Sequence, residues 1–269
     1  MMRKMIIVMA LAVWGSVFCA GSGLRAQGND DSYRDLLAKY VTAGPSGISL
    51  VDYSKWKKIK ADLQRLDAYL ASLQSLTPSA MERDQAFAFW VNLYNAATLK
   101  VLLDNYPVNS IRDIKSTGTG LLDFKASSGP WRTKFLTVEG QSLSLDNIEH
   151  DILRPKFRDP RVHYAVNCAS IGCPNLKRTP WTAKALEADL EAAARAYINH
   201  PRGVSIGADG SVRVSSIYHW FKEDFGGGHK GVIAHLRKFA KPELAAKLAD
   251  NASIAGHDYS WSLNAVGGK

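Results

Sequence analysis

Two cysteines lie close together near the middle of the sequence, Cys168 and Cys173, and a short apolar run that contains His163 precedes them. A thiol near an imidazole can act as a nucleophile, because a neighbouring imidazolium lowers the thiol pKa from its free value of about 8.5. The same two cysteines can instead form a disulfide, which an oxidising compartment favours. The pattern therefore indicates a site at residues 163–173 and leaves its chemistry open.

A third residue with chemical potential is Glu149, which lies in a predicted helix over residues 145–154. At about 100° per residue, Glu149 falls on the apolar face, between Leu145 and Ile152. A carboxylate among core side chains costs free energy unless it is paired or protonated. We therefore expect either a structural ion pair or a carboxylate that orients His163 or relays protons to it.

The resulting hypothesis for an active site has Cys168 as the nucleophile, His163 as the base and Glu149 or Asn167 as the orienting group. The alternation of side chains along a strand counts against a simple pair. If residues 162–168 form an unbroken strand, His163 and Cys168 point to opposite faces. They then meet only where the strand ends or bulges near Asn167.

A zinc site is a further alternative. Zinc binds sulfur, imidazole and carboxylate ligands. Glu149 or His150, together with His163, Cys168 and Cys173, offers these ligand types, but the positions form no compact ligand motif. We therefore assign no metal and no other cofactor to the chain.

Two asparagines lie in the middle of a long predicted helix over residues 79–104, where asparagine is a poor helix former. On a helical wheel Asn92 and Asn95 flank the apolar stripe beside Leu99. We expect their side chains to form hydrogen bonds with another segment. Either they anchor the 163–173 loop, or they bind a substrate together with Asn167.

The elements around these residues are mostly helices. Apolar periodicity predicts helices at residues 30–42, 53–73, 79–104, 145–154, 182–198, 216–225, 230–240 and 242–250. Short strands are predicted at residues 134–138, 162–168, 204–206 and 212–214. Pro155 should end the helix that carries Glu149, and residues 115–130 should form a loop. This mixture indicates an α+β fold, a helix-rich single domain with a small antiparallel sheet and a hairpin.

The first residues have the order of a cleaved export signal. Arg3 and Lys4 precede an apolar run over residues 5–18, and small residues follow it. This run is too short to cross a bilayer, which takes about 20 apolar residues. We therefore expect a signal peptide over residues 1–26, a single domain over 27–269, no transmembrane span in the mature chain, and a periplasmic or secreted location.

Composition narrows the choice of partners. The chain has 269 residues, of which 46% are hydrophobic and 22% charged, and its formal net charge is +9. The lysines and arginines are scattered and form no basic stripe of the kind that nucleic-acid binding needs. We therefore expect no nucleic-acid partner. For an exported thiol enzyme we expect a small substrate that is peptide-like or comes from the cell envelope.

The candidate residues lie in stretches that together span most of the mature chain: FWVNLYNA (89–96), LSLDNIEH (143–150), ILR (152–154), DPRVH (159–163), NCAS (167–170) continuing to CP (173–174), WFKEDF (220–225) and YSWSLN (259–264). These stretches resemble an uncharacterised family, the domain of unknown function numbered 547. The resemblance implies no reaction, but it implies that six of the candidates are motif positions: Asn92, Asn95, Glu149, His163, Cys168 and Cys173.

The predicted strand with His163, beside a buried helix, is also similar to a papain or transglutaminase core. Those folds place the cysteine ahead of the histidine strand, whereas here Cys168 follows it. Three functions therefore stay open. They are a thiol-dependent hydrolase or acyl transferase that uses Cys168, His163 and Glu149, a non-catalytic binding module whose loop is fixed by a Cys168–Cys173 disulfide, and a zinc-dependent hydrolase.

Overall fold

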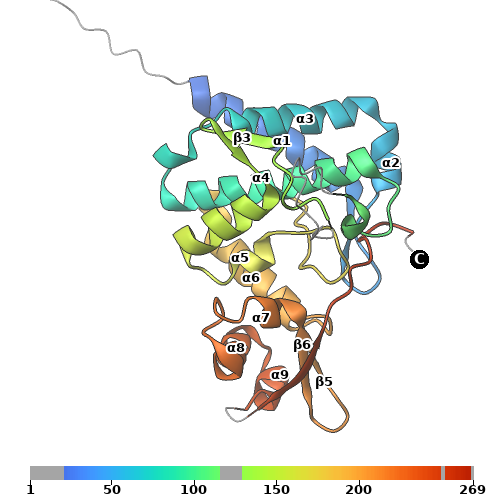
Figure 1. Cartoon of the computed structure of the whole chain (residues 1–269), viewed down its shortest axis with the longest axis vertical. Helices are drawn as coiled ribbons and strands as arrows, with labels where there is room; N and C mark the ends of the chain where they lie inside the picture. Colours follow the sequence, from blue (N-terminus) through green and yellow to red (C-terminus); the bar gives the residue numbers. More distant parts are fainter. Residues whose placement is uncertain (1–20, 116–128, 250–251, 268–269) are drawn as a thin grey trace, which may run out of the picture.

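The computed structural model describes residues 21–115, 129–249 and 252–267 (Figure 1). Residues 1–20 of the expected signal peptide and residues 116–128 of the expected loop lie outside the described part of the chain. Four helices build the N-terminal half: α1 (Gly21–Tyr40), α2 (Tyr53–Lys58), α3 (Lys60–Gln74) and α4 (Arg83–Asn105). The predicted 53–73 helix is divided in two, because Ile59 between α2 and α3 has an extended backbone.

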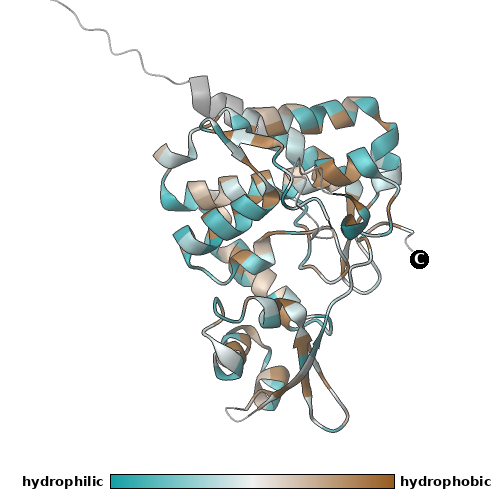
Figure 2. Cartoon of the chain, viewed as in Figure 1, coloured by the Kyte–Doolittle hydropathy of each residue, from teal (hydrophilic) through white to brown (hydrophobic). Residues whose placement is uncertain are grey.

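The central element of this half is α4, which is buried around most of its circumference. Helix α3 packs on one side of it and the helix that carries Glu149 on another. Along α3, hydrophilic and hydrophobic residues alternate (Figure 2), as expected for a helix with one face on the core. Among the described residues, α4 is the one helix long and apolar enough to cross a membrane, but most of it is buried inside the protein, as a core helix is.

The start of α4 differs from the prediction. Residues Pro78–Ala80 form a separate turn of 3-10 helix, η1, and α4 begins only at Arg83. The helix ends where the sequence indicates, because Tyr106 has an extended backbone before Pro107.

The strands are short and mostly form hairpins. Antiparallel pairs join β1 (Val41–Ala43) to β2 (Ser49–Val51), β3 (Leu136–Val138) to β4 (Gln141–Leu143), and β5 (Val204–Ile206) to β6 (Val212–Ser215). The β5–β6 pair confirms the hairpin predicted over residues 204–214. Strand β3 lies within the strand predicted over 134–138, whereas its partner β4 was not predicted. Strand β7 (Ile254–Asp258), which was not predicted, pairs with β6 in parallel. The α+β class is therefore confirmed.

The helix that carries Glu149 is a π-helix, η3 (Asn147–Phe157), and it continues through Pro155. The prediction of an α-helix that Pro155 ends is therefore wrong. In an α-helix the proline ring collides with the carbonyl group four residues earlier. The hydrogen bonds of a π-helix run to the fifth residue instead, and its turns are wider, so the chain passes Pro155 without ending. π-helices are rare, and the single-turn π-bulges in which they mostly occur are frequent at functional sites.

The predicted strand over 162–168 is also wrong, because Val162–Ala165 form a short helix, α5. The side chain of Asp159 accepts a hydrogen bond from the backbone N–H of Arg161 at 2.9 Å, which starts a turn just ahead of α5. The backbone then closes from Val166 N to Val162 O. The similarity to a papain or transglutaminase core rested on a strand here, and that strand is absent.

Helix α5 lies at the boundary between two hydrophobic clusters. Its Val162 and Ala165 belong to the cluster around α4, whereas Tyr164 belongs to the C-terminal cluster. The C-terminal part contains α6 (Leu186–Ile198), α7 (Ser216–Trp220), α8 (Gly228–Phe239) and α9 (Pro242–Lys247), as Figure 1 shows. Because α5 is held by both clusters, His163 is fixed between the two halves of the fold.

Truncation of Leu99, which is buried in α4, should destabilise the protein strongly. Leu99→Ala leaves a cavity beside the helix that positions the site, and we expect the free energy of unfolding to fall by about 3 kcal/mol. Urea denaturation followed by circular dichroism measures the change. Ile59→Ala is the control, because Ile59 is 40% exposed and should cost well under half as much. Equal losses in the two variants would contradict this description of the core.

Candidate functional site

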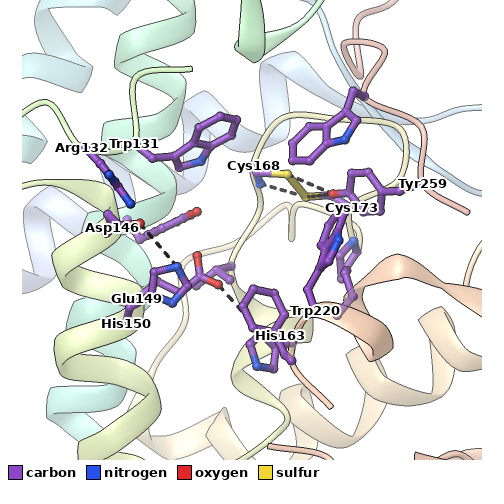
Figure 3. A pocket seen from close by; sticks show the side chains of 16 residues that line it. Trp131, Arg132, Asp146, Glu149, His150, His163, Cys168, Cys173, Trp220 and Tyr259 are labelled. Atoms are coloured by element: carbon purple, nitrogen blue, oxygen red, sulfur yellow. Dashed lines mark hydrogen bonds and ion pairs between the residues drawn. A yellow bond between two sulfur atoms is a disulfide. The ribbon is translucent and has the colours of Figure 1, made fainter. Parts of the chain in front are cut away.

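A cavity of about 290 Å³ opens where the two halves of the fold meet (Figure 3). Tyr94 of α4, Glu149 of η3 and His163 of α5 all line it. Cys168 and Cys173 line another part of the wall. The structure therefore brings the predicted cysteines, histidine and glutamate to one cavity, although they come from separate elements.

The other walls of the cavity are mainly aromatic. Trp131 and Trp261 meet edge to face with ring centroids 5.7 Å apart. The Tyr259 ring packs against Trp261 at 4.7 Å and against Trp220 at 4.9 Å. Side chains of this kind present large rigid apolar surfaces with few conformations to lose, which suits them to hold a ligand.

His163 is almost fully buried, at 2% exposure, and both of its ring nitrogens face carboxylates. Its Nε2 lies 2.7 Å from Oδ2 of Asp224, and its Nδ1 lies 3.9 Å from Oε1 of Glu149. Because an ionised carboxylate only accepts, the Nε2 proton is donated to Asp224. Nδ1 is then the nitrogen that faces Glu149. The ring also stacks on Phe221, with centroids 4.2 Å apart.

Asp224 is held from its other side by Arg154. Nε and Nη2 of Arg154 donate to the two carboxylate oxygens at 2.5 and 3.1 Å, which is a bidentate pair. Partial burial acts to raise the pKa of the Asp224 carboxyl, but the hydrogen bonds from His163 and Arg154 outweigh burial and hold this pKa well below its usual value. Asp224 is therefore an anion that fixes the orientation of His163.

The π-helix explains why Glu149 and Arg154 serve the same site. Residues five apart are about 140° apart around an α-helix, but they lie on the same face when hydrogen bonds run from i to i+5. Glu149 is 9% exposed and faces the cavity. Burial and the Glu149 carboxylate together hold the pKa of Tyr94 well above its usual value, so Tyr94 stays protonated beside this acid. His150 lies at the edge of the cavity, 3.5 Å from Asp146.

Cys168 and Cys173 form a disulfide in this structure. Their Cα atoms are 6.3 Å apart, within the usual range for a disulfide. Cys173 is only 4% exposed, whereas Cys168 is half-buried and faces the cavity. The Tyr259 hydroxyl lies 3.1 Å from each of the two sulfur atoms. The active-site hypothesis needs a free thiol, and the disulfide leaves none in this state. His163 makes its polar contacts with the carboxylates and not with sulfur.

The three candidate asparagines bind backbone groups and do not line the cavity. Asn92 exchanges two hydrogen bonds with the backbone of Trp181. Asn95 donates to Ala165 O and accepts from the backbone N–H of Asn167. The Asn167 side chain donates to Pro174 O and accepts from Ala169 N. We therefore assign Asn95 and Asn167 to holding the loop over residues 166–174, and Asn92 to holding the segment at Trp181.

The same loop contains a non-glycine residue in the left-handed region, Ala169, with φ of 61°. Such a conformation is strained for alanine and persists only where neighbouring contacts enforce it. Here Asn167 holds the N–H of Ala169, and the backbone N–H of Asn264 donates to its carbonyl oxygen at 3.0 Å. The segment that carries Cys168 is therefore tightly determined by its surroundings.

The zinc alternative finds no ligand set in the described residues. No group of three or more His, Cys, Asp or Glu side chains in this part of the chain is arranged to hold a metal ion. Cys168 and Cys173 are bonded to each other, and His163 is enclosed by carboxylates and the Phe221 ring.

Four residues of the site were not selected from the sequence: Tyr94, Arg154, Asp224 and Tyr259. All four lie in the stretches that carry the family resemblance. That signal alone did not distinguish them from neighbouring core residues. Asp224 and Tyr259 are far from His163 and Cys168 in the sequence, so only the folded chain brings them together.

Replacement of Asp224 should reveal its ionic role through pH. The folded protein lowers its pKa, so Asp224 contributes its full stability above the unfolded pKa of about 4 and loses it as the pH falls toward the folded value. We expect Asp224→Asn to lower the free energy of unfolding by about 2 kcal/mol at pH 7. The difference from the wild type should shrink steadily below pH 4. Urea denaturation at several pH values measures it.

The matched control is Asp258→Asn, because Asp258 also pairs with an arginine, Arg213, but its side chain is 74% exposed. An exposed pair contributes little, so this variant should unfold almost as the wild type does at every pH. A loss for Asp224→Asn no larger than for Asp258→Asn would show that the His163–Asp224–Arg154 contacts are not formed.

Comparison with known protein families matches residues 78–198 to the family described as Protein of unknown function, DUF547. Neither the curated proteins nor the solved structures that were compared include a significant match. The matched segment contains Tyr94, Glu149, His163 and both cysteines, whereas Asp224 and Tyr259 lie beyond it. The resemblance found in the sequence is confirmed over residues 78–198, where this chain matches the model of the DUF547 family of proteins of unknown function.

Proposed function

We propose that the cavity is an active site for thiol-dependent hydrolysis or acyl transfer, with Cys168 as the nucleophile in its reduced form. The observation that carries this proposal is that Cys168, His163 and Glu149 line one cavity although they come from separate segments. Such a combination of a thiol, a buried base and a second carboxylate is typical of acid–base sites. The aromatic walls supply the surface that holds the substrate.

Asp224, His163 and Glu149 form a row of contacting side chains, and protons are transferred along this row. Asp224 fixes the ring of His163 through Nε2, as the carboxylate of a catalytic triad does. Nδ1 then exchanges protons with Glu149, and both of these side chains line the cavity. Arg154 neutralises the charge of Asp224 and keeps this carboxylate from drawing the proton away.

The reaction has two steps. In the first, reduced Cys168 gives its proton to the His163–Glu149 pair and its sulfur attacks the carbonyl carbon of the acyl group. The pair returns the proton to the leaving group as a thioester forms. In the second step a water molecule, or an acceptor amine, gives its proton to the pair and attacks the thioester, which restores the thiol. We propose a peptide-like or cell-envelope substrate and, from the export signal, a periplasmic or secreted location.

A second candidate is a binding module whose disulfide fixes a recognition loop. The Cys168–Cys173 disulfide and the cluster of Trp131, Trp220 and Trp261 favour it. A binding module needs no free thiol, whereas the enzyme does. The two candidates therefore make opposite predictions for the oxidised and the reduced protein.

The thiol proposal predicts that reduced Cys168 is unusually reactive. Its alkylation by iodoacetamide should follow a pKa clearly below 8.5, because the nearby His163 stabilises the thiolate. His163→Asn should return that pKa to about 8.5. His219→Asn is the control, because His219 is exposed and lies outside the cavity. Peptide mass spectrometry assigns the alkylated cysteine as a function of pH.

Acyl chemistry itself is tested with an activated ester, p-nitrophenyl acetate. Reduced protein should acquire one acetyl group on Cys168, and Cys168→Ser should acquire none at that position. Glu149→Gln should form and release the acetyl-enzyme at least tenfold more slowly, because the proton carrier that faces the cavity is lost. If Cys168 is never acetylated and its alkylation follows an ordinary pKa, the enzyme proposal is wrong.

The binding module predicts saturable quenching of tryptophan fluorescence when oxidised protein is titrated with a soluble digest of peptidoglycan. Trp131→Ala should weaken that binding about tenfold by removing one aromatic wall. Ile59→Ala is the control, because Ile59 is on the exposed surface. Binding that is lost on oxidation and restored on reduction would contradict this second candidate.

A further inference from the structure

Hydrogen bonds around the Cys168–Cys173 disulfide hold its loop in place, so the disulfide is not needed for that purpose. Asn167 Nδ2 donates to Pro174 O at 2.7 Å, so one hydrogen bond ties together the two residues that flank the disulfide. Backbone hydrogen bonds from Ile171 N to Ser262 O and from Gly172 N to Ser260 O hold the loop against the C-terminal segment. The loop therefore keeps its shape without the sulfur–sulfur bond.

The stabilisation that this disulfide can provide is also small. A disulfide stabilises mainly by removing conformations from the unfolded chain, and this effect grows with the length of the loop it closes. Cys168 and Cys173 are only five residues apart. This disulfide contributes little to stability, and its loop is anchored by other contacts. It also faces a cavity, which is the position of a reactive disulfide.

The two sulfur atoms are not equivalent. Cys168 is half-buried and faces the cavity, whereas Cys173 is 4% exposed. Both cysteines line the cavity, but Cys168 is the more exposed residue and is therefore the more accessible to an incoming thiolate. Figure 3 shows the disulfide on the cavity wall, between Trp131 and Tyr259.

Donor groups already surround the sulfur of Cys173. The backbone N–H of Cys168 donates to it at 3.0 Å, a contact that the sulfur of Cys168 lacks. The Tyr259 hydroxyl lies 3.1 Å from both sulfur atoms and can donate to Cys173. Ser170 in turn donates to the Tyr259 oxygen at 2.9 Å, which directs the tyrosine proton toward sulfur. Burial raises the pKa of Tyr259 well above its usual value, so this hydroxyl keeps its proton. A thiolate formed at Cys173 would be stabilised at once, and stabilised thiolates are the better leaving groups.

We propose that Cys168–Cys173 is an exchange-active disulfide that a dithiol reduces by attack on Cys168, with Cys173 as the leaving thiolate. The first thiolate of the dithiol bonds to the sulfur of Cys168 as the Cys168–Cys173 bond breaks, and the Cys173 thiolate takes up a proton. The second thiolate of the dithiol then attacks the dithiol's other sulfur, which is bonded to Cys168 in the mixed disulfide. This step releases the thiolate of Cys168. Two electrons pass from the dithiol to the cysteine pair, and the dithiol leaves as a disulfide.

This reaction deepens the proposed function, because it releases the thiol on which that function rests. Exchange itself needs no acyl chemistry, so the two proposals can fail separately. Thiol titration follows exchange, and acetylation of Cys168 follows the acyl reaction. Rapid exchange without acetylation would leave the disulfide proposal standing and end the acyl proposal. If the native disulfide does not exchange, but protein that was reduced in denaturant and refolded is acetylated on Cys168, the acyl proposal stands and the disulfide proposal ends.

The test uses the full chain in its oxidised form and dithiothreitol as the dithiol. Without denaturant, two thiols should appear per protein in addition to the one that Cys19 contributes, while circular dichroism and tryptophan fluorescence show that the fold is retained. Tyr259→Phe should slow the reduction about tenfold, the kinetic equivalent of one hydrogen bond to a charged group. Tyr106→Phe is the control, because Tyr106 is also half-buried but lies outside the cavity.

A second variant and a second readout keep the test decisive if Tyr259→Phe folds poorly. Ser170→Ala removes the hydroxyl that donates to Tyr259 and that also lies 3.3 Å from the sulfur of Cys168, and it should slow reduction by a smaller factor. With the monothiol glutathione, peptide mass spectrometry should find the mixed disulfide on Cys168 and a free thiol on Cys173. Reduction that requires denaturant, a rate unaffected by both variants, or glutathione on Cys173 would overturn the proposal.

Discussion

The hydrogen bond between His163 and Asp224 is the interaction on which the rest of the site depends. A buried imidazole needs partners for its ring nitrogens, because an unpaired polar group inside a protein is costly. Asp224 satisfies Nε2 at 2.7 Å, and Arg154 supplies the positive charge that allows a carboxylate to remain ionised there. Nδ1 is then left for Glu149 and the cavity. Without Asp224 the ring would have no fixed direction.

Two features of the backbone place these groups. The π-helix η3 aligns Glu149 and Arg154, which an α-helix would turn away from each other. The short helix α5 is held by both hydrophobic clusters, so that His163 meets Asp224 from the C-terminal half. The adjacent loop is fixed by Asn95 and by its own hydrogen bonds. Buried polar groups are therefore concentrated in one small region, as is common at functional sites of proteins.

Much of this arrangement follows from the sequence, but not the part that depends on backbone geometry or long-range contacts. The α+β class, the hairpin over residues 204–214 and the central helix around Asn92 were predicted because apolar periodicity and turn residues are local signals. Glu149 was recognised from its position on an apolar face. The strand predicted over 162–168 is wrong because a turn started by Asp159 overrides a short apolar run. Asp224 and Tyr259 join the site only through tertiary packing, which no local pattern reports.

The most direct measurement is nitrogen-15 nuclear magnetic resonance of His163, with His163→Asn used to assign its signals. The neutral ring should carry its proton on Nε2, and Asp224→Asn should abolish that preference, since an amide can accept or donate with either ring state. A neutral ring with its proton on Nδ1, or a ring unaffected by Asp224→Asn, would contradict the account. In that case Glu149 would face no acceptor nitrogen, and the proton pathway into the cavity would not exist.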